Sequence, residues 1–340
     1  MTTSPFFLLG AGFGADAGRL VGPIEAESLY IGKYRFACEY PLVRDLPVLC
    51  FPDASPPVSV EEIEHRLGIA LAAGDVEPFK RLSHALGKAD HYLAPRLVGC
   101  PTTPNAYAKF FGDFPESSFG TYNYDAFVEY ALFRAGRWSP HDGFGVPVAV
   151  EKGFTAEPYE MRDSTSLVLH LHGTYSVYEY SHAFGPPDLG GVQWMQVYEK
   201  PRYAFDPVSL SFYPCERFMA GLAYDPRVER RVVAPIPDKA TGLTADFIQI
   251  AMRRTTELAL RAQVVVAIGY AFSQHDRASY AGLLDALAGQ AGSRLLMVCP
   301  DAEQVVERIR QDGPAPQCAA APMGFADWVN AGYPYLSRSV

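Results

Sequence analysis

The chain has 340 residues, of which 49% are hydrophobic and 20% are charged. Its net charge of −9 argues against a nucleic-acid-binding surface and against a patch for anionic membranes. The six cysteines form no Cys-x-x-Cys pair, which excludes a zinc ribbon and a disulfide-dense scaffold and favours a reducing, cytoplasmic location. No apolar run is long enough for a membrane-spanning helix. Apolar residues 6–17 imitate a signal peptide, but no basic residue precedes Arg19, so we expect none.

The first predicted strand, residues 6–9, leads into the glycine-rich segment Gly10-Ala11-Gly12-Phe13-Gly14-Ala15. This spacing fits the GxGxxA pattern, in which glycines let backbone N–H groups approach a pyrophosphate. Gly18 and Gly22 follow too soon for a long helix, and the acidic strand tip of a dehydrogenase is missing. A glycine-rich turn without a ligand is the alternative.

Residues 41–115 are predicted to form a helical insertion between strands of a sheet. Ser59 and Glu62 have the spacing of a capping box for a helix that ends at Gly74. A second helix opens directly after it, and we expect it to stop at Gly87.

The segment Thr121-Tyr122-Asn123-Tyr124-Asp125 precedes a helix that is expected to stop at Gly136. Polar side chains are favourable at a helix start, because its backbone donors are unpaired. An N-cap role would explain Asp125 but not Asn123. Both residues are therefore candidates for catalysis, and a pure capping role for Asp125 stays open.

The predicted strand 166–171 carries the segment His170-Leu171-His172-Gly173 at its end. Strand alternation places both histidines on one face. A metal pair would need a third and usually a fourth ligand, and only His182 is near, so no metal is expected. His172 occupies the strand end where parallel sheets hold ligands, whereas His170 is expected to be an ordinary core histidine.

Residues 175–230 read as an irregular, aromatic-rich insertion, either a lobe near the substrate or an oligomer contact. A strand is predicted at 231–236. A helix over 244–261, with Thr244 as N-cap, leads into the C-terminal third.

Two buried strands, 263–268 and 294–299, alternate with helices in the C-terminal third, an order typical of parallel neighbours. Gly269 and Tyr270 end the first of these strands, and Gly269 would let a ligand come close. Polar residues follow each strand, and helix capping is the competing role for them. These residues are Ser273 and Asp276 after the first strand and Asp301 after the second, where Gln304 would be the reciprocal partner of a capping box.

All these segments lie at the carboxyl ends of predicted parallel strands, which is where open α/β sheets bind dinucleotides. We therefore expect an α/β fold, a Rossmann-like parallel sheet with helices on both faces, as a single domain over residues 1–340.

The order GAGFGADAG, TYNYD, HLHG, VVAIGYAFSQHD and a strand ending in CPD resembles the sirtuin-like family. More closely, it is similar to the bacterial sirtuin-like NAD hydrolases, several of which serve in defence against phage. The resemblance covers about residues 6–301 with divergent insertions between the motifs.

The resemblance implies a role for each matching residue. Asn123 would lie by the nicotinamide ribose and His172 would act as a base on ribose hydroxyls or water, with Asp125 beside them. The residues implied to contact the phosphates, riboses or adenosine of NAD are Gly10, Ala11, Gly12, Phe13, Asp16, Gly269, Tyr270, Ser273 and Asp301.

The chain departs from the family in three ways. It lacks the two Cys-x-x-Cys pairs that protein deacylases of the family use for zinc, which lowers a deacylase interpretation. Gly14 and Ala271 stand where the family often has serine. Each lost hydroxyl would be worth about 1 kcal/mol if it bonded the ligand.

The expected activity is hydrolysis of NAD to nicotinamide and ADP-ribose. The alternatives are a non-catalytic sensor of NAD or ADP-ribose, and an NAD-dependent deacylase or ADP-ribosyl transferase. Because a constantly active NAD hydrolase would be toxic, we expect control by homo-oligomerisation or by a regulatory protein.

Overall fold

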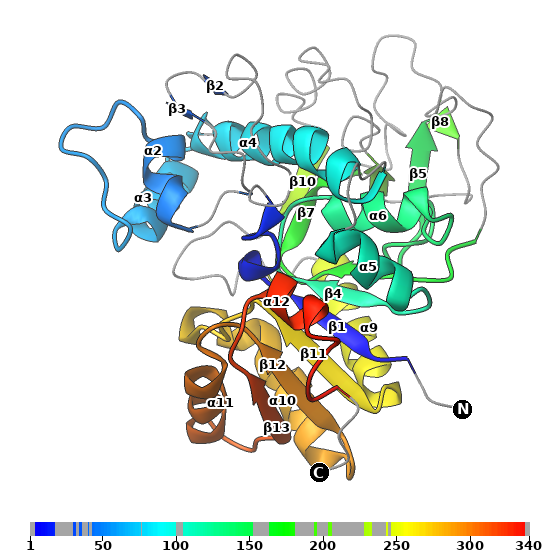
Figure 1. The fold of residues 1–340 in the computed structure, drawn as a ribbon. Coiled ribbons are helices and arrows are strands. Elements are labelled where there is room, and N and C mark those ends of the chain that lie inside the picture. The colour runs from blue at the N-terminus through cyan, green and yellow to red at the C-terminus, as the bar shows by residue number, and fades with distance from the viewer. Residues whose placement is uncertain are drawn as a thin grey trace.

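The computed structural model describes residues 4–17, 30–31, 34–35, 40, 43–75, 77–99, 105–151, 163–180, 194–195, 203–205, 228–232, 243 and 246–336. Its centre is a parallel six-stranded sheet in the order β13-β12-β11-β1-β4-β6 (Figure 1). The strands are β1 (Phe6–Leu9), β4 (Phe119–Thr121), β6 (Val168–His170), β11 (Val264–Ile268), β12 (Arg294–Val298) and β13 (Gln317–Ala321). Numbered along the chain, these strands lie 3-2-1-4-5-6 across the sheet, the order of the Rossmann-like fold. The predicted fold class is confirmed.

The last residues of the six strands lie in a single row across the sheet. Leu9 pairs with Ile268 on one side and with Thr121 on the other. The row continues outward through Val298 and Ala321, and through His170 beyond Thr121. The chain segments that follow these strands therefore leave the sheet at one common edge.

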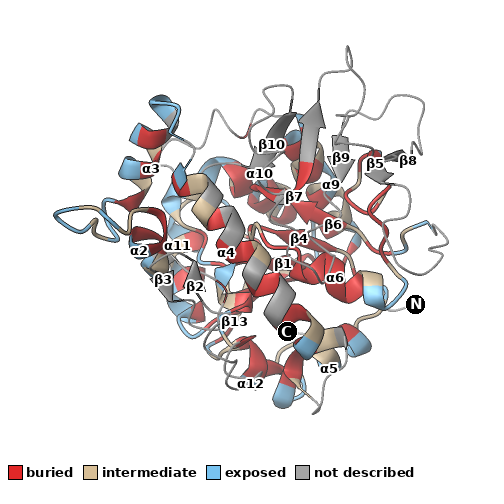
Figure 2. Ribbon diagram, turned by 90° about the horizontal axis from the view of Figure 1, so that it is seen from above, coloured by how far each residue is buried: buried red, intermediate tan, exposed pale blue. Residues whose placement is uncertain are grey.

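Both faces of the central strands β1, β11 and β12 are buried, which explains why these strands read as nearly continuous apolar runs. Phe7 and Leu9 pack into one core, and Phe6 and Leu8 alternate into the other. Figure 2 shows buried residues concentrated in these strands and exposed residues gathered around α3.

Helices cover both faces. Those with buried residues in the first core include α5 (Ala106–Asp113), α6 (Phe127–Arg134) and α12 (Phe325–Asn330). The second core is lined by α10 (Arg277–Gly289) and α11 (Ala302–Gln311), and α9 (Asp246–Arg261) contributes to both. Helices α6, α9, α10 and α11 match predicted ones, whereas α5 and α12 were not predicted. Gly136 follows α6 with a φ of +68°. Thr244 lies outside the described residues.

The chain between β1 and β4 contains helices α2 (Leu46–Cys50), α3 (Ile63–Ala72) and α4 (Glu77–Ala94), a single-turn π-helix (Pro95–Gly99) and α5. The capping box is confirmed, because Glu62 N donates to Ser59 Oγ at 3.3 Å and Ser59 N donates to Glu62 Oε2 at 3.4 Å. The expected stop at Gly87 is wrong. The helix continues because Ala89 and Leu93 are buried, which offsets the roughly 1 kcal/mol that an interior glycine costs.

A second, five-stranded sheet has the order β10-β7-β9-β5-β8. Its strands are β5 (Val148–Glu151), β7 (Gly173–Tyr180), β8 (Trp194–Met195), β9 (Tyr203–Phe205) and β10 (Val228–Val232). The predicted irregular insertion 175–230 thus contains strands in its described parts. The strand expected at 231–236 overlaps β10 at 231–232, and residues 233–236 lie outside the described residues. β10 pairs antiparallel with β7 and does not join the parallel sheet.

Short elements complete the described chain. Strands β2 (Tyr30–Ile31) and β3 (Tyr34–Arg35) form a two-stranded sheet, and 3₁₀ helices cover Ala11–Phe13, Val43–Asp45 and Gln274–Asp276. None of the helices in the described part of the chain is long and apolar enough to cross a membrane.

Candidate functional site

The turns after β1 and β11 meet where the strand order reverses, which is the ligand position in open α/β sheets. Gly12 N donates to Gly269 O at 3.0 Å. A Cβ on Gly10 would lie 2.6 Å from Gly269 O, and one on Gly269 would lie 2.4 Å from Gly12 C. Gly269 also has a φ of +62°, a conformation that favours glycine. Packing of one turn on the other therefore explains these glycines without a ligand, and the Gly12 N–H is already engaged.

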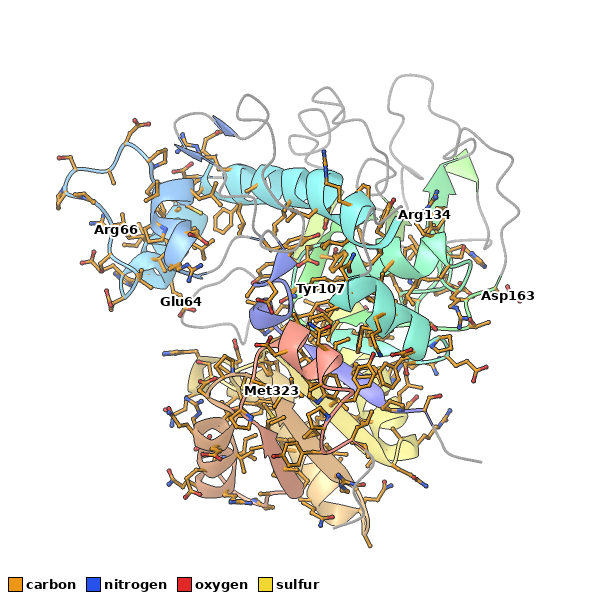
Figure 3. All side chains as sticks on the ribbon, in the orientation of Figure 1. Glu64, Arg66, Tyr107, Arg134, Asp163 and Met323 are labelled. Carbon is orange, nitrogen blue, oxygen red and sulfur yellow. The ribbon has the colours of Figure 1, made fainter. Side chains whose placement is uncertain are left out.

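Two residues of the predicted pyrophosphate loop have other contacts. The ring of Phe13 is buried and lies edge-on to Tyr107 and Phe325 in the aromatic core. Tyr107 lies close to the turn (Figure 3), and its hydroxyl donates to Phe13 O at 2.5 Å. Asp16 Oδ2 accepts from Ala326 N at 3.3 Å, at the start of α12. In this loop Ala11 is exposed and Gly12 half-buried.

Asn123 lies against the turn after β1. Its side-chain Nδ2 donates to Gly10 O at 3.2 Å. Its backbone N–H donates to Thr121 Oγ1 at 3.0 Å, which ties it to the end of β4. The structure therefore brings Asn123 to the glycine turns, as the sequence predicted.

The ring of His172 lies against that of Tyr122. The two rings are edge-on with centroids 5.0 Å apart, and the ring of Tyr122 in turn stacks on Tyr270 at 3.8 Å and 4°. His172 and both tyrosines are buried. The aromatic contacts of Tyr122 thus connect His172 to the turn after β11. His172, like Asn123, therefore lies at the common edge of the sheet.

The acid beside His172 is Asp276, whose Oδ1 is 3.7 Å from His172 Nε2. Asp276 stands at the N-cap position of α10 but makes no side-chain capping bond. Ser273 caps the 3₁₀ helix Gln274–Asp276 that precedes α10, because its Oγ accepts from His275 N at 3.3 Å. Burial and then the neighbouring Asp276 carboxylate contribute to raising the pKa of the Tyr122 hydroxyl. The sequence left capping and a functional role open for Asp276 and did not predict its contact with His172.

His170 has quite different neighbours. Its Nε2 is 2.6 Å from Glu129 Oε1, and its Nδ1 is 3.1 Å from the carbonyl oxygen of Asn123. Because β6 ends at His170 and Gly173 has a φ of +78°, strand alternation does not extend to His172. The expectation that both rings share one face does not hold: His170 lies near Phe144 of the first core, whereas His172 lies near Tyr122 of the second.

Asp125 is buried at the start of α6, where its Oδ1 accepts from Phe127 N at 3.3 Å. Burial, and then the nearby Glu129 carboxylate, raise the pKa of Asp125 to about 6. The N-cap position of α6 is Ala126 and has no side-chain capping bond, so Asp125 is not the N-cap; its carboxylate bonds across the turn directly before the helix.

Asp301 is exposed at the start of α11 and makes no capping bond, so the box predicted for Asp301 and Gln304 is not formed. Burial and the adjacent Asp301 carboxylate raise the pKa of the Cys299 thiol to about 12.

Among the described residues, one group of three side chains has donor atoms within 4.8 Å of one another, namely His141, Asp142 and Asp163. Asp163 is fully exposed at the periphery of the molecule (Figure 3), and its Oδ1 lies 3.6 Å from His141 Nε2. Neither histidine of the HLHG segment belongs to this group.

The assembled edge contains an amide, an imidazole with a carboxylate near it, and two glycine turns. These groups can orient a ribose and deliver a nucleophile to it. No protein-family model matches the chain, and no curated protein matches it at a significant level.

Proposed function

We propose that this chain binds NAD at the carboxyl edge of the parallel sheet and hydrolyses it to nicotinamide and ADP-ribose. The observation that carries the proposal is the convergence of separate segments: Asn123 bonds the turn at Gly10, and the ring of Tyr122 links His172 to Tyr270. A resemblance in motif order would be accidental if these segments lay apart.

Cleavage of the nicotinamide–ribose bond requires few catalytic groups from the protein. Nicotinamide is attached through a cationic ring nitrogen and leaves as a neutral molecule, so no general acid is needed. The site has to stabilise an oxocarbenium-like ribose and direct a water molecule to it. In the proposal the Asn123 amide orients the ribose and water, and His172 accepts the proton of water, with the Asp276 carboxylate stabilising the resulting imidazolium.

The test is incubation of the purified full-length chain with NAD alone, followed by chromatography for nicotinamide and ADP-ribose. Asn123→Ala and His172→Ala should abolish release while circular dichroism stays unchanged. Asn330→Ala and His65→Ala, which alter exposed residues on α12 and α3, are the matched controls. Release that appears only with an acyl-lysine peptide would instead indicate a deacylase, and loss in the control variants would exclude a specific site.

A non-catalytic binder is the second candidate, and the surroundings of Gly14 favour it. A Cβ on Gly14 would lie 3.0 Å from the ring of Tyr40, so an aromatic side chain crowds the position where the family often has serine. Tyr40 is buried and its hydroxyl donates to Asp90 Oδ1 at 2.7 Å. Under this alternative, calorimetry detects NAD or ADP-ribose binding but chromatography finds no nicotinamide.

Control of such a hydrolase is part of the proposal. Homo-oligomerisation would activate it in the cytoplasm on a trigger such as phage infection, or a regulatory protein would hold it inactive until then. Sedimentation of the chain with and without NAD tests the oligomer, because activation by assembly requires the active fraction to sediment faster.

A further inference from the structure

Glu129 and His170 form a buried pair that the proposed chemistry does not use. Glu129 comes from α6 and His170 from the end of β6, and their side chains are 1% and 0% exposed. The distance from Glu129 Oε1 to His170 Nε2 is 2.6 Å. The other carboxylate oxygen, Oε2, is buried without a hydrogen-bond partner among the described residues. His170 is thus the partner on which the buried Glu129 depends.

The second nitrogen of His170 determines what the pair does. Nδ1 faces the carbonyl oxygen of Asn123 at 3.1 Å, and because a carbonyl only accepts, Nδ1 carries a proton. Nε2 faces a carboxylate, which holds the second proton of the ring. Burial opposes a charged ring, but Glu129 and the Asn123 carbonyl outweigh it and raise the pKa of His170.

The same pair therefore holds the main chain of Asn123 at its carbonyl oxygen. Two further bonds hold Asn123 from its other groups: its side-chain Nδ2 donates to Gly10 O, and its backbone N–H donates to Thr121 Oγ1. We propose that Glu129 and His170 are positioning residues, which hold the Asn123 backbone so that its amide faces the ligand edge. The inference rests on the proposed function only for what Asn123 does there.

Glu129→Gln is the informative variant, because glutamine has nearly the same shape and can still hydrogen-bond a neutral His170. Glu307→Gln is its control, since Glu307 lies on α11 with a side chain 60% exposed. The double variant Glu129→Gln with His170→Asn leaves neither charge buried, and it carries the test if the single variant does not fold.

Two measurements are made on the full-length chain. Hydrogen–deuterium exchange of a peptide covering residues 121–126 reports on the Asn123 backbone and needs no activity. Initial rates of NAD cleavage separate kcat from KM. A shift of about 1 Å in a reacting group costs roughly 100-fold, so we expect a kcat at least ~10-fold lower, with KM within about 3-fold of the parent.

Faster exchange together with a lower kcat supports the inference. Exchange no different from that of Glu307→Gln overturns it, and so does faster exchange with an unchanged kcat. If the parent chain does not cleave NAD but Glu129→Gln still exchanges faster, the proposed function fails while the role of the pair in holding Asn123 stands.

Discussion

The two histidines of the HLHG segment lie two positions apart, yet the fold places them in opposite situations. His170 is enclosed, with both ring nitrogens at hydrogen-bond distance from named partners on α6 and at Asn123. His172 lies edge-on to Tyr122, whose ring stacks on Tyr270 of the turn after β11, and its Nε2 is 3.7 Å from Asp276 Oδ1. Each histidine has its own carboxylate, but only the Glu129 contact is short enough for a hydrogen bond.

This difference in surroundings separates a structural role for His170 from a catalytic role for His172. A histidine that donates both ring protons to fixed partners has no nitrogen left to accept another proton, so His170 suits a structural role. A histidine that faces a carboxylate at a longer distance keeps the freedom that a base needs, because catalytic contacts often tighten only when the substrate is bound. The comparison therefore predicts different consequences for changing each ring.

The largest expected effect is on turnover. His172→Ala should lower the rate of NAD cleavage by about 10²–10⁴-fold, the range for loss of a general base. Its unfolding free energy should fall by less than about 2 kcal/mol, because the ring loses contacts but leaves no buried charge unpaired. Initial rates and urea denaturation of the same preparation check both parts. If His172→Ala lost as much unfolding free energy as His170→Ala, the distinction between a catalytic and a structural histidine would fail.

His170→Ala should act on stability. It leaves the Glu129 carboxylate buried without its partner, which costs about 3–5 kcal/mol. Equilibrium denaturation of this variant beside His65→Ala measures the difference. A loss below about 1 kcal/mol would mean that the pair contributes little.

Asp276→Asn is expected to have a moderate effect on turnover. Asparagine keeps the shape but removes the negative charge facing His172, and an approximately tenfold lower kcat, about 1.4 kcal/mol, would be a typical loss for a nearby charge. Asp285→Asn, an exposed change on the same helix, is the control. Equal rates for the two variants would mean that Asp276 does not assist His172.

The strands and helices of the C-terminal third were predictable from sequence, because their patterns are local. The apolar run of β11 is buried on both faces, and the Leu283, Leu284 and Leu287 stripe of α10 faces the second core. The capping box at Ser59 was predictable for the same reason. By contrast, β13 is composed largely of alanine and has no strand signal, and the strands of the second sheet depend on distant partners.

The residues of the candidate site likewise fall into those that the sequence predicted and those that it missed. Asn123 was found because a capping role explained Asp125 but not Asn123, and His172 was found because it follows an apolar run that predicts a strand. Glu129 and Asp276 were missed because their partners are distant in sequence and because capping explained an acid at a helix start. One signal did exist for Glu129, since it is the single acid in a helix whose residues Phe127–Leu132 are all buried. A charge without a polar face indicates a buried partner.

The smallest effect is expected from Asp125→Asn, which tests the second acid near His170. Because the folded-state pKa of Asp125 is raised to about 6 from 3.8, its contribution to stability is complete below pH 3.8 and is lost as pH rises through 6. Asparagine has no such loss and can still accept from Phe127 N. Relative to the parent, the variant should therefore gain on the order of 1 kcal/mol at pH 8 and nothing near pH 4. Urea denaturation across this range checks the sign. A gain that is independent of pH would contradict the raised pKa of Asp125. It would mean that the ionisation of Asp125 is not coupled to the charges of Glu129 and His170, so that only the Glu129–His170 pair would act electrostatically on Asn123.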